Sequence, residues 1–210
     1  MKTEKIRGVY PIIDVDACKK RDPVHVLSKA LAAGATVVQL RAKDLPAGEF
    51  AEIAKKMAAL CKESGALFIV NDRLDVAVLS GADGVHLGQD DLPLHAARKV
   101  AGDDFIIGVS THNEQEAKEA GEGGADYIGF GAMYATGTKE GVTEPQGTAN
   151  LAKIVEAVDV PVAAIGGIDM SNIAEVRDAG ASAAAVISAV CGAKFAGEAA
   201  SKLMGLWEHG

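Results

Sequence analysis

Two basic side chains and one amide side chain lie at the end of an apolar run near the start of the chain, in the segment Val38–Lys43. If this run is a strand, alternation directs Gln39, Arg41 and, at the strand end, Lys43 to one side, where they could hold an anionic group. The spacing therefore indicates a phosphate or diphosphate site. Arg41 and Lys43 could instead form ion pairs with acidic loop residues, and this alternative stays open.

Carboxylates follow the next two apolar runs. Asp72 comes directly after Leu67–Asn71, and Asp91 lies a few residues beyond Gly84–His86. Because neighbouring strands lie about 5 Å apart, the two carboxylates could share one hard cation. Mg2+ fits, since it is held by few carboxylates and completed by water and substrate phosphate. Either residue could instead cap the helix that follows it.

Glycines and a serine follow the last two apolar runs. Gly166 and Gly167 come after Val162–Ile165, and Ser188 comes after Ala184–Ile187. The loops after the seventh and eighth strands of a (β/α)8 barrel often hold a phosphate, and glycine lets the backbone approach a ligand closely. These junctions therefore indicate a phosphate site.

A long irregular segment, Gly131–Thr148, is rich in Gly and Thr and exceeds most βα connections in length. It carries two hydroxyls and a cation, on Thr136, Thr138 and Lys139. The segment could be a mobile loop that covers a ligand, or an idle surface excursion.

His86 ends the apolar run Gly84–His86, and His112 follows the run Phe105–Val109. Imidazole titrates near neutrality, so either residue could act as an acid or a base. We interpret both as residues that orient neighbouring loops, because no Ser or Cys nucleophile with a paired base is evident in the sequence. Cys61 lies in a helical stretch and is interpreted as a packing residue.

The elements that must position these residues are apolar, β-rich runs that alternate with longer stretches of helical spacing from one end of the chain to the other. Several helical stretches end in a Gly-Ala pair, with Gly suited to the left-handed residue past a helix end. We therefore expect an α/β fold, a single (β/α)8 TIM barrel over residues 1–210, with its chemistry at the carboxyl ends of the strands. The expected strands are Val9–Asp14, Thr36–Arg41, Leu67–Asn71, Gly84–His86, Phe105–Val109, Tyr127–Phe130, Val162–Ile165 and Ala184–Ile187.

Composition excludes several classes of function. A net charge of -8 and 4% aromatic residues argue against a nucleic-acid surface. There is no apolar run of about 18 residues, so we expect no membrane span. The scattered cysteines lack metal or disulfide spacing, and a reducing cytoplasm fits them best.

The combined pattern resembles bacterial thiamine-phosphate synthases over nearly the full length. Each motif alone is weak to moderate, but their order and their placement at strand ends are specific. The motifs are Val38–Lys43, Phe68–Arg73, Gly84–Pro93, Gly108–His112 and Thr136–Lys139, extended by Ile165–Ile168 and Ile187-Ser188. Gly131–Tyr134 departs from the family, where a Gly-Pro pair is common, and the opening Tyr10–Asp14 is a looser match, so no role is given to Asp14.

The resemblance implies a Mg2+-dependent transferase that joins an aminopyrimidine methyl diphosphate to a thiazole phosphate, or its carboxylated form, with release of diphosphate. The residues implied for the pyrimidine diphosphate are Gln39, Arg41, Lys43, Asn71, Ser110 and Lys139, of which Arg41, Lys43, Ser110 and Lys139 are the candidate catalytic residues. Those implied for the thiazole phosphate are Thr136, Thr138, Gly167, Ile187 and Ser188. Asp72 and Asp91 would hold Mg2+, and Leu40, Ala42 and Gly137 are counted with the substrate-binding residues of their motifs.

Two rivals remain on the same barrel. One is a related thiazole tautomerase, which needs neither the diphosphate-binding set nor Mg2+. The other is a non-catalytic barrel that binds a phosphorylated ligand. The expected partners are small phosphorylated molecules, without nucleic acid or membrane, and the sequence is compatible with a homo-oligomer.

Overall fold

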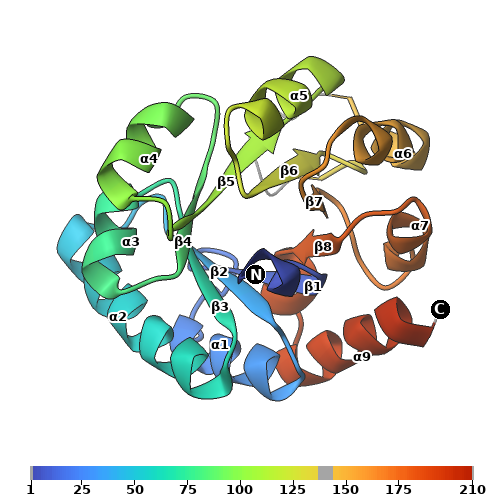
Figure 1. Cartoon of the computed structure of the whole chain (residues 1–210). Coiled ribbons are helices and arrows are strands. Elements are labelled where there is room, and N and C mark those ends of the chain that lie inside the picture. The colour runs from blue at the N-terminus through green and yellow to red at the C-terminus, as the bar shows by residue number, and fades with distance from the viewer. Residues whose placement is uncertain (1, 137–143, 210) are drawn as a thin grey trace.

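A closed ring of parallel strands with helices outside it forms the molecule (Figure 1), in a computed structural model that describes residues 2–136 and 144–209. The strands pair in chain order, and β8 returns to pair with β1. This arrangement is a (β/α)8 barrel, as predicted. The strands are β1 (Gly8–Asp14), β2 (Val37–Arg41), β3 (Leu67–Asn71), β4 (Gly84–Leu87), β5 (Ile106–Thr111), β6 (Tyr127–Gly131), β7 (Val162–Ile165) and β8 (Ala183–Val186).

Helices surround the strands in the order of the chain (Figure 1). A short 3-10 helix, η1 (Lys2–Lys5), precedes β1. The last helix, α9 (Ala196–His209), packs against the first, α1 (Pro23–Ala32). No helix within the described residues is both long and apolar enough to cross a membrane. The helices are α1 (Pro23–Ala32), α2 (Ala47–Ser64), α3 (Leu74–Ser80), α4 (Leu94–Ala101), α5 (Glu114–Glu122), α6 (Gly147–Ala157), α7 (Ile173–Asp178), α8 (Ser188–Cys191) and α9 (Ala196–His209).

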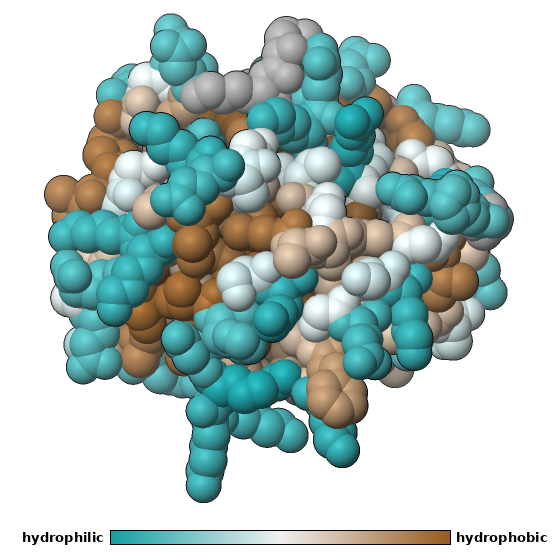
Figure 2. All heavy atoms as spheres, turned by 90° about the horizontal axis from the view of Figure 1, so that it is seen from below, coloured by the Kyte–Doolittle hydropathy of each residue, from teal (hydrophilic) through white to brown (hydrophobic). Residues whose placement is uncertain are grey.

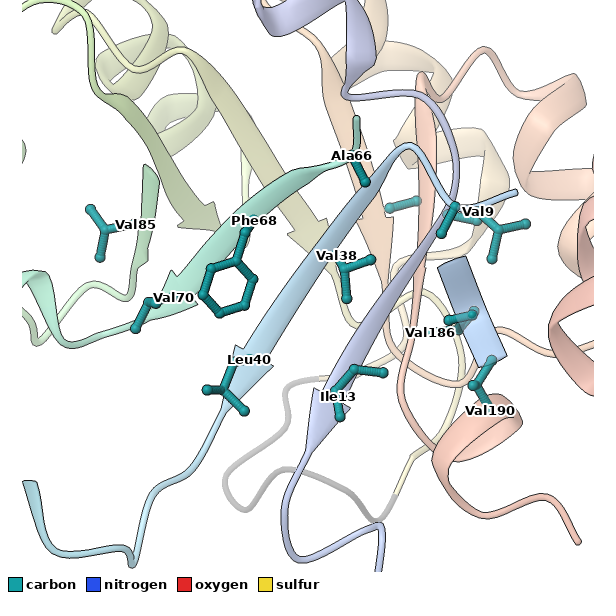
Figure 3. Packing of buried hydrophobic residues seen from close by; sticks show 14 of the residues in the cluster. Val9, Ile13, Val38, Leu40, Ala66, Phe68, Val70, Val85, Val186 and Val190 are labelled. Atoms are coloured by element: carbon teal, nitrogen blue, oxygen red, sulfur yellow. The ribbon is translucent and has the colours of Figure 1, made fainter. Parts of the chain in front are cut away.

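Alternation along each strand builds two apolar layers. Val9, Ile13, Val38 and Leu40 point outward and pack in the layer between the strands and the helices (Figure 3). Their neighbours point into the barrel, where a second cluster fills its interior. The inward cluster is Ile6, Tyr10, Ile12, Val37, Leu67, Ile69, Ile106, Tyr127, Ala163, Ala183 and Ala185.

The Gly-Ala pairs end their helices as the sequence predicts. Gly34, Gly81, Gly124 and Gly180 all have positive φ, between 73° and 106°. Only glycine adopts this backbone without a steric penalty. The chain is thereby turned back toward the next strand at four similar points of the barrel.

The outer surface is mixed in character. Figure 2 shows hydrophilic side chains over most of one side of the barrel, with apolar patches between them. This surface accords with a negatively charged chain whose apolar groups are mostly in the two internal layers.

Candidate functional site

A cavity of about 540 Å³ opens at the carboxyl ends of the strands. This size lies within the usual range for small-molecule sites. Most of the residues singled out from the sequence line it, namely Gln39, Arg41, Lys43, Asn71, Asp72, Asp91, Ser110, Thr136, Gly167, Ile187 and Ser188. Gly137, Thr138 and Lys139 lie outside the described residues.

Leu40 and Ala42 do not line the cavity. Both are buried in the outer layer, between the strands and the helices. Strand alternation explains this, because Gln39 and Arg41 take the inward positions of β2. As side-chain contacts to substrate, the predictions for Leu40 and Ala42 are therefore corrected.

Arg41 is held by an acidic residue for which the sequence analysis predicts no role. Asp14 ends β1 directly opposite Arg41 in the sheet register, and their side chains form an ion pair. Asp14 is 2% exposed and also accepts a hydrogen bond from the N–H of Ala17 at 2.8 Å. The ion-pair alternative thus applies to Arg41, although its partner ends a strand rather than lying in a loop. A guanidinium has five donors, so the pair leaves others for the cavity that Arg41 lines.

The carboxylates of Asp72 and Asp91 lie together on the cavity wall. Burial, and after it the negative charge of Asp91, raises the pKa of Asp72 to about 6, against the opposing effects of Lys43 and Arg41. Two oxygen ligands that repel one another in this way fit a shared divalent cation, which would remove the repulsion. Within the described residues no group of three or more His, Cys, Asp and Glu could hold a metal.

Neither carboxylate caps a helix. The residues before α3 and α4 are Arg73 and Pro93, and no side-chain capping bond is present at either helix. Asp91 instead accepts a hydrogen bond from the N–H of Gly88 at 2.6 Å, which closes its own loop. Asp72 has a φ of 62°, a left-handed conformation that aspartate tolerates better than most residues. Such backbone is common at functional sites, and here it places a carboxylate on the cavity wall.

Glycines at the seventh junction are required by the close approach of the backbone. Gly166 and Gly167 have φ of 100° and 69°, and a Cβ on Gly167 would lie 2.8 Å from the carbonyl oxygen of Ala135. A side chain at either position would force the loops apart. Gly167, Ile187 and Ser188 all line the cavity at this side of the barrel.

Ser110 has an imidazole partner, although the sequence shows no serine with a paired base. Strand β5 continues to Thr111, so Ser110 points inward, and its Oγ lies 2.9 Å from Nε2 of His86. Nδ1 of His86 lies 2.9 Å from the hydroxyl of Tyr127, a phenol rather than the carboxylate of a hydrolytic triad. Burial raises the pKa of Tyr127, which keeps it a neutral phenol.

The hydrogen bonds continue from Tyr127 across the floor of the cavity. The hydroxyls of Tyr127 and Tyr10 lie 3.0 Å apart, and Nε2 of Gln39 donates to Tyr10 at 3.0 Å. No sequence motif pointed to Tyr10 or Tyr127, because they are 117 residues apart. Their positions on the inward face of β1 and β6 were the available signal.

His112 acts as the sequence interpretation proposed. Its Nδ1 lies 2.9 Å from a carboxylate oxygen of Glu116, and its backbone N–H donates to the same oxygen. These bonds tie the end of β5 to the first turn of α5. Cys61 is fully buried within the outer layer, in agreement with packing.

The amino-acid sequence is similar to those of known proteins. The family model described as thiamine monophosphate synthase matches residues 9–190. The chain is 45% identical over 195 residues to a thiamine-phosphate synthase of Moorella thermoacetica, covering 93% of each chain. It is also 45% identical over 202 residues to a thiamine-phosphate synthase of Methanospirillum hungatei, covering 96% of this chain and 98% of the relative.

Solved structures give the same result at the level of the fold. The chain is 40% identical to a thiamine phosphate pyrophosphorylase from Pyrococcus furiosus, with a TM-score of 0.89 over 98% of this chain and 97% of that one. A 3-hexulose-6-phosphate synthase at 19% identity and a TM-score of 0.65 shares the fold alone.

Proposed function

The chain belongs to the thiamine monophosphate synthase family, and from that premise we propose how the residues of its cavity divide between two anion sites. The family's activity is transfer of a pyrimidinylmethyl group from its diphosphate to a thiazole phosphate, which gives thiamine phosphate and diphosphate. The observation that carries the assignment is the convergence of Arg41, Lys43, Asp72 and Asp91 on one cavity.

The first site, for the pyrimidine diphosphate, lies on the side of β2 to β5. Arg41 and Lys43 supply positive charge there, and Gln39, Asn71 and Ser110 supply neutral hydrogen-bonding groups. Asp14 fixes the guanidinium of Arg41, so that it is positioned before the ligand arrives. We assign Lys139 to this site as well, on the resemblance of its motif.

Asp72 and Asp91 fit a Mg2+ ion, which when bound would neutralise negative charge on the departing diphosphate. Their contribution as residues is to supply two oxygen ligands from the loops that follow the adjacent strands β3 and β4. Burial, and after it repulsion by Asp91, raises the pKa of Asp72, and a cation bound between the two carboxylates would relieve that repulsion.

The second site, for the thiazole phosphate, lies across the barrel at β7 and β8 (Figure 1). Gly167, Ile187 and Ser188 form it, in the loops that hold phosphates in many barrels of this kind. Thr136 lines the same cavity, and we assign Thr138 beside it from the motif. Two anion sites on opposite walls would place the pyrimidine methylene and the thiazole nitrogen between them.

The reaction we propose is dissociative. Diphosphate leaves first, the electron-rich aminopyrimidine stabilises the cation at its methylene, and the thiazole nitrogen then forms the new C–N bond. Arg41 and Lys43 stabilise the charge that accumulates on the leaving group. No general base is needed at the nitrogen, which attacks through its lone pair.

The test is to mix the purified chain with both substrates and Mg2+ and to measure thiamine phosphate and diphosphate together. The proposal predicts equal amounts of the two products. Each substrate omitted in turn is the control, and its reaction should give no thiamine phosphate. Isomerisation of a thiazole phosphate without diphosphate release would instead indicate a tautomerase, and binding without turnover would indicate a ligand-binding barrel.

A further inference from the structure

A chain of four hydrogen bonds crosses the floor of the cavity and connects two predicted substrate-binding residues. It runs from Gln39 through Tyr10, Tyr127 and His86 to Ser110, with each step between 2.9 and 3.0 Å. Tyr10 and Tyr127 are at most 1% exposed. No buried side-chain nitrogen or oxygen within the described residues lacks a hydrogen-bond partner.

The direction of the chain follows from counting hydrogens. Because Gln39 donates to the oxygen of Tyr10, the single hydroxyl hydrogen of Tyr10 goes to Tyr127. The hydrogen of Tyr127 then goes to Nδ1 of His86, so a neutral ring carries its hydrogen on Nε2 and donates to Ser110. The opposite direction would leave the buried hydroxyl hydrogen of Tyr10 without an acceptor in the chain, which is costly in the interior.

This direction gives the two ends opposite character. Ser110 accepts from His86, so its own hydrogen is available to a ligand. Gln39 uses its NH2 on Tyr10, so its carbonyl oxygen is available as an acceptor. Diphosphate oxygens are acceptors only, and the exocyclic amino group of an aminopyrimidine is a donor.

We propose that Tyr10, Tyr127 and His86 are positioning residues that couple recognition of the diphosphate at Ser110 to recognition of the pyrimidine amino group at Gln39. This inference rests on the proposed function of the cavity. A pyrimidine with an oxo group in place of the amino group would present its oxo oxygen to the carbonyl oxygen of Gln39, and both atoms are acceptors. To bind it, the amide of Gln39 must turn over and the chain must reverse, which withdraws the hydrogen of Ser110 from the diphosphate.

The barrel is shaped around this chain. A Cβ on Gly108 would lie 2.2 Å from Cζ of Tyr127 and 2.6 Å from Nδ1 of His86. A Cβ on Gly129 would lie 3.0 Å from Cε1 of the same imidazole. Both glycines occupy inward positions that could otherwise carry side chains, and the rings fill the space that they leave.

The first test is the tautomer of His86 in the wild-type protein. Long-range 1H–15N spectra of 15N-histidine-labelled protein would be recorded without ligand and with inorganic diphosphate and Mg2+, and the His86 signals assigned by their loss in His86→Gln. The proposal predicts the Nε2–H tautomer in both states. The Nδ1–H tautomer would show the opposite direction and overturn it.

The second test is discrimination between the two ring types. Calorimetry without thiazole would give the Kd of the aminopyrimidine diphosphate and of its 4-oxo analogue, for wild type, Tyr127→Phe and Tyr134→Phe. Tyr134 is the matched control, because its hydroxyl donates to the exposed Glu175 and takes no part in the hydrogen bonds that run from Gln39 to Ser110. We expect Tyr127→Phe to reduce the amino-over-oxo preference by about tenfold or more, since uncoupling frees Gln39 to turn over, and Tyr134→Phe to leave it unchanged.

A wild-type enzyme that turns over its substrates while Tyr127→Phe keeps the full preference would refute the coupling and leave the proposed function intact. A wild type that neither binds diphosphate nor forms product would refute the proposed function itself. If Tyr127→Phe does not fold, the wild-type tautomer decides the question.

Discussion

Replacement of Asp72 by Asn should make the metal-free protein more stable while removing one ligand of the proposed Mg2+ site. The pKa of Asp72 is raised to about 6 from its ordinary 3.8, first by burial and then by Asp91. A carboxyl group whose folded pKa is raised stabilises the fold only in its protonated form, so stability is lost as pH rises from about 4 to about 6. At pH 7.5 the metal-free wild type therefore carries the whole penalty.

The magnitude follows from the size of that shift. Each pKa unit corresponds to about 1.4 kcal/mol, so full strength would be about 3 kcal/mol. Asp72 is only half-buried, and solvent screens part of the effect, so we expect about 1 to 2 kcal/mol. For a chain of this length this raises Tm by about 3 to 6 °C. Asn adopts the left-handed backbone of this position at least as well as Asp, so the change adds no strain.

The assay is urea and thermal unfolding of wild type, Asp72→Asn and Asp90→Asn at pH 7.5 with EDTA, repeated with Mg2+ and at pH 4. Asp90 is exposed on the loop between β4 and α4, next to Asp91, and serves as the control. We expect the gain only for Asp72→Asn, its disappearance at pH 4, and stabilisation by Mg2+ mainly in the proteins that keep Asp72. An Asp72→Asn protein that is no more stable than wild type at pH 7.5 in EDTA would refute the like-charge site.

Three further predictions follow from the cavity. Ser188→Ala should mainly raise the KM for thiazole phosphate, and an unchanged KM would remove Ser188 from that site. Asp14→Ala should cost about 3 kcal/mol of unfolding free energy, because it leaves the largely buried guanidinium of Arg41 unpaired; it should also raise the KM for the diphosphate substrate, whereas the exposed Asp16→Ala should do neither. A pyrimidine substrate that carries an electron-withdrawing substituent should slow the chemical step by destabilising the cation, about tenfold for each 1.4 kcal/mol added to the barrier, and an equal single-turnover rate would contradict the dissociative path.

The barrel could be predicted from the sequence because each strand is a short β-rich run and each helix ends at a recognisable signal. The run Leu67–Asn71 and the run Val162–Ile165 match β3 and β7 at both ends. The fifth strand runs beyond its predicted end at Val109, because the polar residues Ser110 and Thr111 continue it. A strand whose last residues are polar because they face a cavity is therefore predicted to end too early.

The cavity was predictable in part, and the missed features share one cause. Arg41 and Asp72 could be found because they follow apolar runs, where barrel chemistry is expected. The sequence predicts no role for Asp14, although it ends the first run, because its importance depends on which residue lies opposite it in the neighbouring strand. The contact between Tyr10 and Tyr127 is likewise set by closure of the barrel, which a single sequence does not display.

Leu40 shows the opposite case. It belongs to a motif predicted to bind substrate, but alternation between Gln39 and Arg41 directs its side chain outward. The sequence leaves the capping alternative open for Asp72 and Asp91. The structure excludes it, because Arg73 and Pro93 precede the two helices and neither helix has a side-chain capping bond.

A crystal structure with Mg2+ and diphosphate bound would show whether both bind in this cavity. We predict diphosphate in contact with Arg41, Lys43 and Ser110, with Mg2+ between it and the carboxylates of Asp72 and Asp91. Diphosphate bound elsewhere on the surface, or a metal ion that does not contact either carboxylate, would contradict this prediction.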